Sequence, residues 1–309
     1  MIREQTKVLV VGVHTEETLS RIRALPDCRL VLAEDVRAVR PEDLADAEIL
    51  VGFPAPELVR QMPRLRFVQL YSAGANNFSW LPKEITLANA YGAFGESIAE
   101  HMLTTTLMAM KRMPEYLRMQ DRQEWSLLDN IGRFAGSKVL SVGMGAIGTT
   151  YLQKAYSLGA LCYGVRRTVH DCPDFVEELV TPDGMDALLP EMDVVALSLP
   201  GTDAVTGMFD ERRLRLMKSS AILLNVGRGN SVVTEDLLKV MADGHIRAAR
   251  PGVQPFGRRA KHRRGIAEAR GLHGLQRAYA PNGDVVLKLR VHIKVPRRPP
   301  PPPRASREG

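Results

Sequence analysis

The chain has 309 residues, 45% hydrophobic and 25% charged, the proportions of a globular protein that can bury a core. No stretch approaches the roughly 18 consecutive apolar residues of a membrane-spanning helix, so such a helix is excluded and we expect no membrane partner. The N-terminus runs straight into a strand-like segment without a signal-peptide pattern. Three cysteines, Cys28, Cys162 and Cys172, lack the spacing of a disulfide framework or a metal site. We therefore expect a cytoplasmic protein without a metal centre.

The net charge of +7 is concentrated at one end of the chain. Residues 250–309 contain 15 Lys and Arg against 3 Asp and Glu, which leaves 27 and 32 for residues 1–249. This segment also carries five consecutive prolines at 299–303, a composition typical of disorder or polyproline II. Such a segment could neutralise phosphates, but Phe256 and Tyr279 are its only aromatic residues, so base stacking has little support. We expect no nucleic-acid partner.

Apolar segments alternate with helical patterns along the first 249 residues. The expected strands are 7–12, 29–32, 49–53, 67–71, 85–88, 138–142, 161–165, 194–199 and 221–225. The expected helices are 16–25, 55–62, 96–112, 147–158, 185–189, 210–216 and 234–242. Strands that alternate with helices indicate parallel βαβ units. The chain is therefore predicted to be α/β, with two Rossmann- or flavodoxin-like domains built on parallel sheets.

The two alternating series give the domain boundaries. We expect a substrate domain over residues 1–95 and a nucleotide-binding domain over residues 96–249. The basic, proline-rich tail of residues 250–309 follows, and the second sheet is expected to be incomplete at its C-terminal end.

A glycine loop lies between the strand at 138–142 and the next helix. It reads Gly143-Met-Gly145-Ala146-Ile147-Gly148, the GxGxxG pattern in the strand-to-helix context that dinucleotide binding requires. The first glycine permits the tight turn, the second lets backbone N–H groups approach a pyrophosphate, and the third allows close packing of helix on strand. The helix N-terminus then faces the phosphates.

The next strand ends in Arg166-Arg167-Thr168, where an acidic residue would bind the ribose 2′-hydroxyl of NAD. Two guanidinium groups and a hydroxyl suit a 2′-phosphate instead. We favour NADP(H) as the cofactor. The alternative is that these arginines form a solvated loop and that NAD(H) is accepted.

Together these features resemble the D-isomer-specific 2-hydroxyacid dehydrogenases, the family of phosphoglycerate dehydrogenase and glyoxylate/hydroxypyruvate reductase. The resemblance covers about residues 1–249 and rests on four segments in order. They are Ser72-Ala-Gly-Ala75, Ile98-Ala-Glu-His101, the loop Gly143–Gly148 and Asn225-Val-Gly-Arg-Gly229.

The resemblance implies a cleft between the two domains that holds the nicotinamide beside a small 2-oxo or 2-hydroxy acid. Arg228 matches the arginine that clamps the substrate carboxylate and polarises the ketone, and Ala73 and Gly74 match the backbone N–H donors to that carboxylate. The positions that match the cofactor cleft are Leu199, Pro200, Thr206, Val226 and Gly227. A homodimer formed through the long helix and its flanking segment is also implied.

Three polar residues invite catalytic roles that we do not assign to them. Glu100 and His101 are adjacent on a helix and point about 100° apart, so they cannot both face one substrate. By resemblance they belong to the packing of the helix. His245 follows a glycine at a helix end, where an imidazole commonly meets terminal carbonyl groups.

The family pattern breaks after Ala249. The family places there a Gly-Leu-Asp-Val segment, then a Glu, then a Pro-His that donates the proton in catalysis, but this chain continues Arg250-Pro-Gly-Val. None of His262, His273 and His292 has the family context. We hypothesise that the segment from about residue 250 derives from a shifted reading frame or a fused exon. Weak or absent turnover is then expected, and the alternative function is a catalytically silent NAD(P)H sensor that acts through partners.

Overall fold

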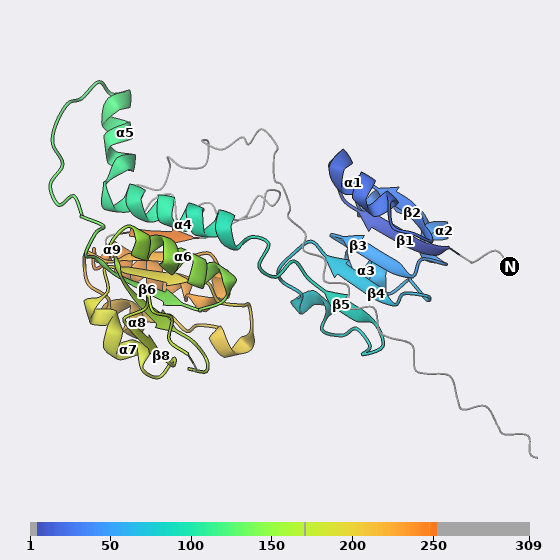
Figure 1. Cartoon of the computed structure of the whole chain (residues 1–309). Helices are drawn as coiled ribbons and strands as arrows, with labels where there is room; N and C mark the ends of the chain where they lie inside the picture. Colours follow the sequence, from blue (N-terminus) through green and yellow to red (C-terminus); the bar gives the residue numbers. More distant parts are fainter. Residues whose placement is uncertain (1–4, 170, 247, 252–309) are drawn as a thin grey trace, which may run out of the picture.

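The computed structural model describes residues 5–169, 171–246 and 248–251, which form two parallel β-sheets with their helices (Figure 1). The first sheet has the strand order β2-β1-β3-β4-β5. Its strands are β1 (Thr6–Val11), β2 (Cys28–Ala33), β3 (Ile49–Gly52), β4 (Phe67–Leu70) and β5 (Thr86–Ala88). All of its pairings are parallel, and the order is that of flavodoxin-like folds.

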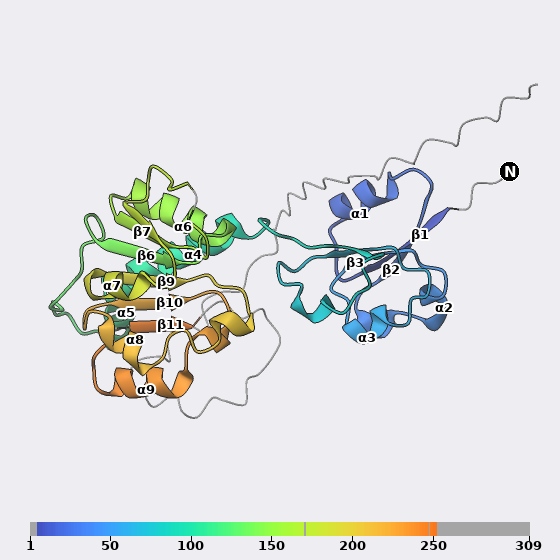
Figure 2. The ribbon, with the colours of Figure 1, turned by 90° about the horizontal axis from the view of Figure 1, so that it is seen from below.

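Helices cover both faces of the first sheet. They are α1 (Glu16–Arg23), α2 (Pro41–Leu44) and α3 (Pro56–Val59), with α1 on one side and α2 and α3 on the other (Figure 2). Helix α1 starts where the Thr15 side chain accepts a hydrogen bond from the Thr18 N–H. Leu9, Val11 and Leu50 pack with α2 and α3 in one core cluster. Burial on both faces explains why the central strand β1 is apolar from Val8 to Val11 rather than alternating.

The second sheet has six parallel strands in the order β11-β10-β9-β6-β7-β8. Its strands are β6 (Lys138–Val142), β7 (Leu161–Val165), β8 (Glu178–Val180), β9 (Val194–Leu197), β10 (Ile222–Asn225) and β11 (Ala248–Pro251). Read from β8, this is the 3-2-1-4-5-6 order of a dinucleotide-binding sheet. The predicted fold of two parallel α/β units is confirmed.

Two cores lie on opposite faces of the second sheet. Helices α4 (Gly95–Met110) and α6 (Ala146–Ser157) pack on one face, and α7 (Met185–Leu188), α8 (Glu211–Leu216) and α9 (Thr234–Ala242) pack on the other. Figure 1 shows α4 and α6 above the sheet and α7 and α8 below it. Because α4 contributes Ala99 and Met102 to the core of the second sheet, the long helix belongs with that sheet.

The structure adds elements that the sequence analysis did not expect. The predicted polar connection after α4 begins with α5 (Met113–Asp121), which Arg112 separates from α4 by adopting left-handed backbone angles (φ 53°). The short edge strand β8 has only three residues, too few for a clear apolar pattern. Strand β11 extends the second sheet to Pro251, two residues beyond the expected boundary at 249. The tail from residue 252 lies outside the described residues, and so does the prediction that the sheet is incomplete after this strand.

None of the described helices is both long and apolar enough to cross a membrane. Cys28, Cys162 and Cys172 are all free thiols. The described residues contain no group of three or more His, Cys, Asp or Glu side chains arranged to hold a metal ion.

One buried polar contact joins α4 to α6. The Tyr151 hydroxyl lies 2.9 Å from Thr106 Oγ1, which in turn donates to the Met102 carbonyl at 2.8 Å, so the tyrosine is the donor in this pair. Both side chains are fully buried, and burial raises the pKa of Tyr151 and keeps it neutral.

We predict that Tyr151→Phe lowers the free energy of unfolding by about 1 kcal/mol, because Thr106 loses its donor in a site without water access. The check is urea-induced unfolding followed by circular dichroism. Tyr156→Phe is the control, since that side chain is 51% exposed and should leave the unfolding midpoint unchanged. Equal effects of the two substitutions would contradict this account of the α4–α6 contact.

Candidate active site

The carboxyl ends of strands from both sheets meet at one cleft of about 580 Å³. In parallel sheets ligands bind beyond these strand ends, where the chain leaves the sheet. The first sheet contributes the segments after β3 and β4, and the second contributes the segments after β9 and β10. The lining residues are Phe53, Pro54, Leu70, Ser72, Gly74, Asn76, Asn77, Phe78, Gly201, Arg228, Gly229 and Asn230.

Arg228 lies on a turn after β10 that Asn225 holds in place. The Asn225 Oδ1 accepts from the Gly227 N–H at 3.0 Å, and its Nδ2 donates to the Arg228 carbonyl at 3.1 Å. Ser231 Oγ donates to the same carbonyl at 2.9 Å. The backbone of the arginine is therefore fixed while its side chain extends into the cleft. No carboxylate of the described residues pairs with its guanidinium.

The guanidinium of Arg228 lies against the backbone of the first sheet's loop. A Cβ added at Gly74 would lie 2.5 Å from Nη2 of Arg228, so a side chain at this position would displace the end of the arginine. Asn76 bridges the same gap by donating from Nδ2 to the Gly201 carbonyl at 2.8 Å. The structure thus brings together Gly74 and Arg228, two of the predicted substrate-binding residues.

The loop of Ala73 and Gly74 is shaped by hydrogen bonds to its carbonyl groups. Asn89 Nδ2 donates to the Ala73 carbonyl and Ser72 Oγ donates to the Gly74 carbonyl, each at 2.8 Å. Within the described chain, the N–H groups of Ala73 and Gly74 have no protein acceptor. Two free backbone donors therefore lie in the loop next to the arginine.

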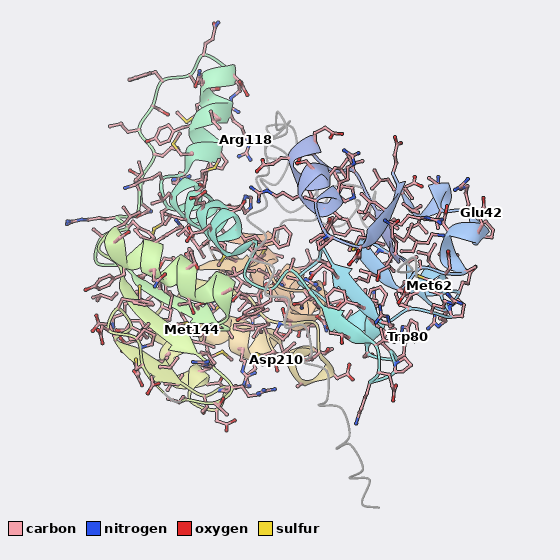
Figure 3. All side chains as sticks on the ribbon, turned by 45° about the vertical axis from the view of Figure 1, so that its right-hand side comes forward. Glu42, Met62, Trp80, Arg118, Met144 and Asp210 are labelled. Carbon is pink, nitrogen blue, oxygen red and sulfur yellow. The ribbon has the colours of Figure 1, made fainter. Side chains whose placement is uncertain are left out.

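The glycine loop has the geometry that its spacing predicts. Gly143 adopts φ +103°, and a Cβ at Gly148 would lie 1.9 Å from the Gly143 carbonyl oxygen. A Cβ at Gly145, by contrast, would have only the Tyr91 hydroxyl nearby, at 3.9 Å. The loop leads directly into α6 at Ala146, and Met144 marks it in Figure 3. Open space in front of Gly145 fits a pyrophosphate.

The remaining predicted cofactor residues gather on the neighbouring strands. Leu199 and Pro200 follow β9, and a Cβ at Gly227 would lie 2.5 Å from the Leu199 carbonyl oxygen, so the two loops are in contact. The Val226 N–H donates to the Leu197 carbonyl at 2.9 Å. Since β9 lies between β6 and β10, these loops connect the glycine loop to Arg228.

Two predicted groups lie at the borders of this region. Thr206 Oγ1 accepts from Asn230 Nδ2 at 2.8 Å, which ties Thr206 to the loop after Arg228. Arg166, Arg167 and Thr168 follow β7, whose last residue, Val165, accepts from the Gly143 N–H at 3.0 Å. All three side chains are exposed, and within the described residues no carboxylate pairs with either arginine.

None of the cleft-lining residues of the described chain is His, Asp, Glu or Cys. His14 is not among the lining residues; its ring is edge-on to Tyr71 and its Nδ1 lies 3.5 Å from the Tyr71 hydroxyl. Its Nε2 is buried without a partner, and burial lowers the pKa of His14. A proton donor that faces Arg228 is therefore absent from the part of the cleft that the structure describes.

The three polar residues that were set aside lie elsewhere. Glu100 pairs with Lys154 of α6 at 3.5 Å, which links it to the packing of α4. Its neighbour His101 does not line the cleft, and partial burial lowers the pKa of its imidazole. His245 Nε2 lies 3.0 Å from the Arg215 carbonyl in the last turn of α8, so it contacts a terminal carbonyl of a neighbouring helix rather than of α9, the helix it follows.

Sequence reasoning missed the two asparagines that organise the site. The motif includes Asn225 but does not indicate its role, and nothing singles out Asn76, although Asn225 ends the buried strand β10 and Asn76 lies in the loop after β4. An amide at such a position can both donate to and accept from the backbone, which is the signal that could have identified them.

A family model for the D-isomer specific 2-hydroxyacid dehydrogenase NAD binding domain matches residues 103–253. Glyoxylate/hydroxypyruvate reductase B from Escherichia coli (strain K12 / DH10B) is 31% identical over 218 residues, which cover 66% of this chain and 66% of that protein. The corresponding protein from Klebsiella pneumoniae is 29% identical over 252 residues, 74% of this chain and 77% of that protein. The chain thus spans about two thirds of the length of the first of these relatives.

Solved structures share the fold. A D-isomer specific 2-hydroxyacid dehydrogenase family protein from Aeromonas salmonicida superposes with a TM-score of 0.76 at 23% identity, covering 86% of this chain and 87% of that one. D-lactate dehydrogenase from Aquifex aeolicus, complexed with NAD and lactic acid, gives a TM-score of 0.67 at 25% identity, covering 80% and 76%. With its glycine loop, its six-stranded nucleotide sheet and its cleft arginine, the chain belongs to the D-isomer-specific 2-hydroxyacid dehydrogenase family.

Proposed function

We propose that this chain is an NAD(P)-dependent oxidoreductase that interconverts a small 2-oxo acid and the D-2-hydroxy acid, with glyoxylate or hydroxypyruvate as the substrate type. Residues 1–95 act as the substrate domain and residues 96–249 as the nucleotide domain. The observation that carries the proposal is the guanidinium of Arg228, which has no carboxylate partner among the described residues and lies against Gly74 in the cleft between the sheets. The E. coli relative is named for the same substrates.

The chemistry of the cleft fits an anionic, planar substrate. The Arg228 fork can hold one carboxylate in two parallel hydrogen bonds, and the free N–H groups of Ala73 and Gly74 add donors from the opposite sheet. A fixed positive charge beside the ketone also stabilises the oxygen on which negative charge develops. Arg228 therefore both orients and polarises the substrate.

The glycine loop is the proposed site of the nucleotide. Gly143, Gly145 and Gly148 leave space for the pyrophosphate, and the loop N–H groups at the start of α6 face it. The other proposed cofactor contacts are Ala146, Ile147, Leu199, Pro200, Thr206, Val226 and Gly227. When bound, the nicotinamide supplies or accepts the hydride.

A second candidate function follows from the cleft lining. A ketone that accepts hydride also needs a proton, and none of the described cleft-lining side chains is His, Asp, Glu or Cys. This observation favours a protein that binds NAD(P)H and a 2-oxo acid with little turnover and responds to the nucleotide through partners. Binding and turnover therefore have to be measured separately.

We predict that Gly74→Ala weakens binding of oxalate, a planar dicarboxylate probe, by about tenfold, because the new methyl group displaces the Arg228 guanidinium and breaks a charge-assisted pair. The measurement is isothermal titration calorimetry with the NADPH-loaded chain, and NADPH-dependent reduction of glyoxylate and hydroxypyruvate is followed by absorbance in parallel. Gly229→Ala is the matched control, since a Cβ there meets nothing within 4 Å.

Equal affinity of both variants for oxalate would contradict the placement of the substrate at Arg228. Reduction of the oxo acids by the wild-type chain supports the dehydrogenase. Tight binding without reduction supports the silent nucleotide-binding protein.

For the cofactor, we propose NADP(H), with NAD(H) as the alternative, on the basis of Arg166 and Arg167. A structural relative of the same fold, a glyoxylate/hydroxypyruvate reductase from Sinorhizobium meliloti with NADP and sulfate bound, is NADPH-dependent (TM-score 0.70, 22% identity, 83% of this chain and 84% of that one). Exposed arginines without carboxylate partners are free to pair with a 2′-phosphate.

We predict that the double substitution Arg166→Ala/Arg167→Ala raises the dissociation constant of NADPH by about tenfold or more, since charge-assisted bonds to the 2′-phosphate are lost. The affinity for NADH should stay within about twofold, because NADH has no phosphate there. Fluorescence titration with each nucleotide gives both constants. A loss of affinity shared equally by NADPH and NADH would show that the arginines do not read the 2′-phosphate.

We further propose a homodimer formed through α4, α5 and the segment after them. Figure 1 shows α5 and the following segment standing away from the second sheet. This segment carries Trp125 and Leu127, which are 99% and 91% exposed. Large apolar side chains so far from any core of their own chain are typical of a surface that a second copy covers.

We predict that Trp125→Ser/Leu127→Ser shifts the chain from dimer to monomer, with the dissociation constant of the dimer raised by about a hundredfold, because two buried apolar anchors are lost. Sedimentation equilibrium measures the constant. Leu32→Ser, at a 45% exposed apolar residue on the edge of the first sheet, is the control and should leave it unchanged. A wild-type chain that sediments as a monomer would overturn the proposal.

A further inference from the structure

Two serine hydroxyls converge on one carbonyl group of the glycine loop. Ser141 Oγ donates to the Gly143 carbonyl oxygen at 3.1 Å, and Ser198 Oγ donates to the same oxygen at 2.8 Å. Ser141 belongs to β6 and is fully buried, whereas Ser198 follows β9, the neighbouring strand. The loop is therefore held from two strands at a single atom.

The next peptide group is held in the same way. Thr149 Oγ1, on the first turn of α6, donates to the Met144 carbonyl at 3.3 Å. In a planar trans peptide the carbonyl and the following N–H point in opposite directions. The Gly143 carbonyl faces the two serine hydroxyls, so the Met144 N–H points away from them. In the same way the Met144 carbonyl faces Thr149, so the Gly145 N–H points away from that hydroxyl. Neither N–H group has a protein acceptor within the described chain.

We infer that the hydroxyls of Ser141, Ser198 and Thr149 act as a clamp that keeps the loop's N–H groups directed at the pyrophosphate. The inference rests on the proposed nucleotide function of the same loop. A glycine at φ +103° allows its peptide to rotate more freely than any other residue would. A rotated Gly143 carbonyl would present a negative oxygen to the phosphates, so the clamp excludes the conformation that repels the ligand.

When one serine is replaced, the other still donates to the Gly143 carbonyl. The effects of Ser141→Ala and Ser198→Ala on NADPH affinity should therefore not be independent of each other. Ser141→Ala and Ser198→Ala should each raise the NADPH dissociation constant about twofold, and the double variant at least about tenfold, more than the product of the single effects. Fluorescence titration of NADPH measures all four chains at a temperature well below their melting temperatures. In nuclear magnetic resonance spectra, the NADPH-induced shifts of the Met144 and Gly145 amide signals should be lost in the double variant.

Ser137→Ala is the matched control. Ser137 is equally a buried serine that donates to a carbonyl, that of Phe134 at 2.7 Å, but it lies at the opposite end of β6 from the loop. It should lower stability without changing NADPH affinity. Ser141→Ala/Ser198→Thr retains one hydroxyl and should bind NADPH as Ser141→Ala does.

The inference is overturned if the double variant binds NADPH as tightly as the wild-type chain, or if Ser137→Ala weakens binding equally. If the double variant does not fold, the test rests on the single variants. The clamp is then overturned if Ser141→Ala and Ser198→Ala bind NADPH with the same affinity as Ser137→Ala. A wild-type chain that binds neither NADPH nor NADH overturns the proposed function and the clamp with it. If the wild-type chain binds NADPH and the double variant binds it equally well, the clamp is overturned but the proposed function is not.

Discussion

The close approach of the Arg228 guanidinium to the backbone at Gly74 is the constraint on which the rest of the site depends. It joins a loop of the second sheet to a loop of the first, and a side chain at residue 74 would displace the guanidinium because a Cβ there would lie 2.5 Å from Nη2. Asn76 and Gly201 add a hydrogen bond at the same crossing. With this approach fixed, a carboxylate that binds the arginine also meets the N–H donors of the opposite loop.

Strand order explains how one sheet serves both halves of the proposed reaction. Strand β9 lies between β6 and β10, so the segment Ser198–Pro200 contacts the glycine loop through Ser198 and the arginine loop through Leu199. The proposed pyrophosphate site and the proposed carboxylate site therefore have one shared neighbour. A shift of that segment would move both sites together, which is how parallel strand ends build a precise site from short loops.

Much of this could be predicted from the sequence because it depends on local chemistry. The glycine spacing after a buried strand predicted the loop, and the apolar runs predicted both parallel sheets. The sequence could not predict β8, which has only three residues, or α5, which depends on left-handed backbone angles at Arg112. The serine clamp was missed for a different reason. Ser141 and Ser198 are 57 residues apart in number and meet only because β6 pairs with β9.

The groups proposed to hold the ligands differ in kind from the proton donor that reduction of a ketone requires. Backbone N–H groups, hydroxyls and guanidinium groups keep their charge and proton count across the physiological pH range. Binding built from them is accordingly insensitive to pH, whereas hydride transfer to a ketone needs a group that changes its protonation state. The described lining of the cleft includes the Arg228 guanidinium and no His, Asp, Glu or Cys, and the glycine loop has free N–H groups at Met144 and Gly145. Under the proposed function, recognition and proton transfer are therefore carried by different groups: Arg228 and backbone N–H groups bind the substrate, and the proton comes from a group other than the described side chains that line the cleft.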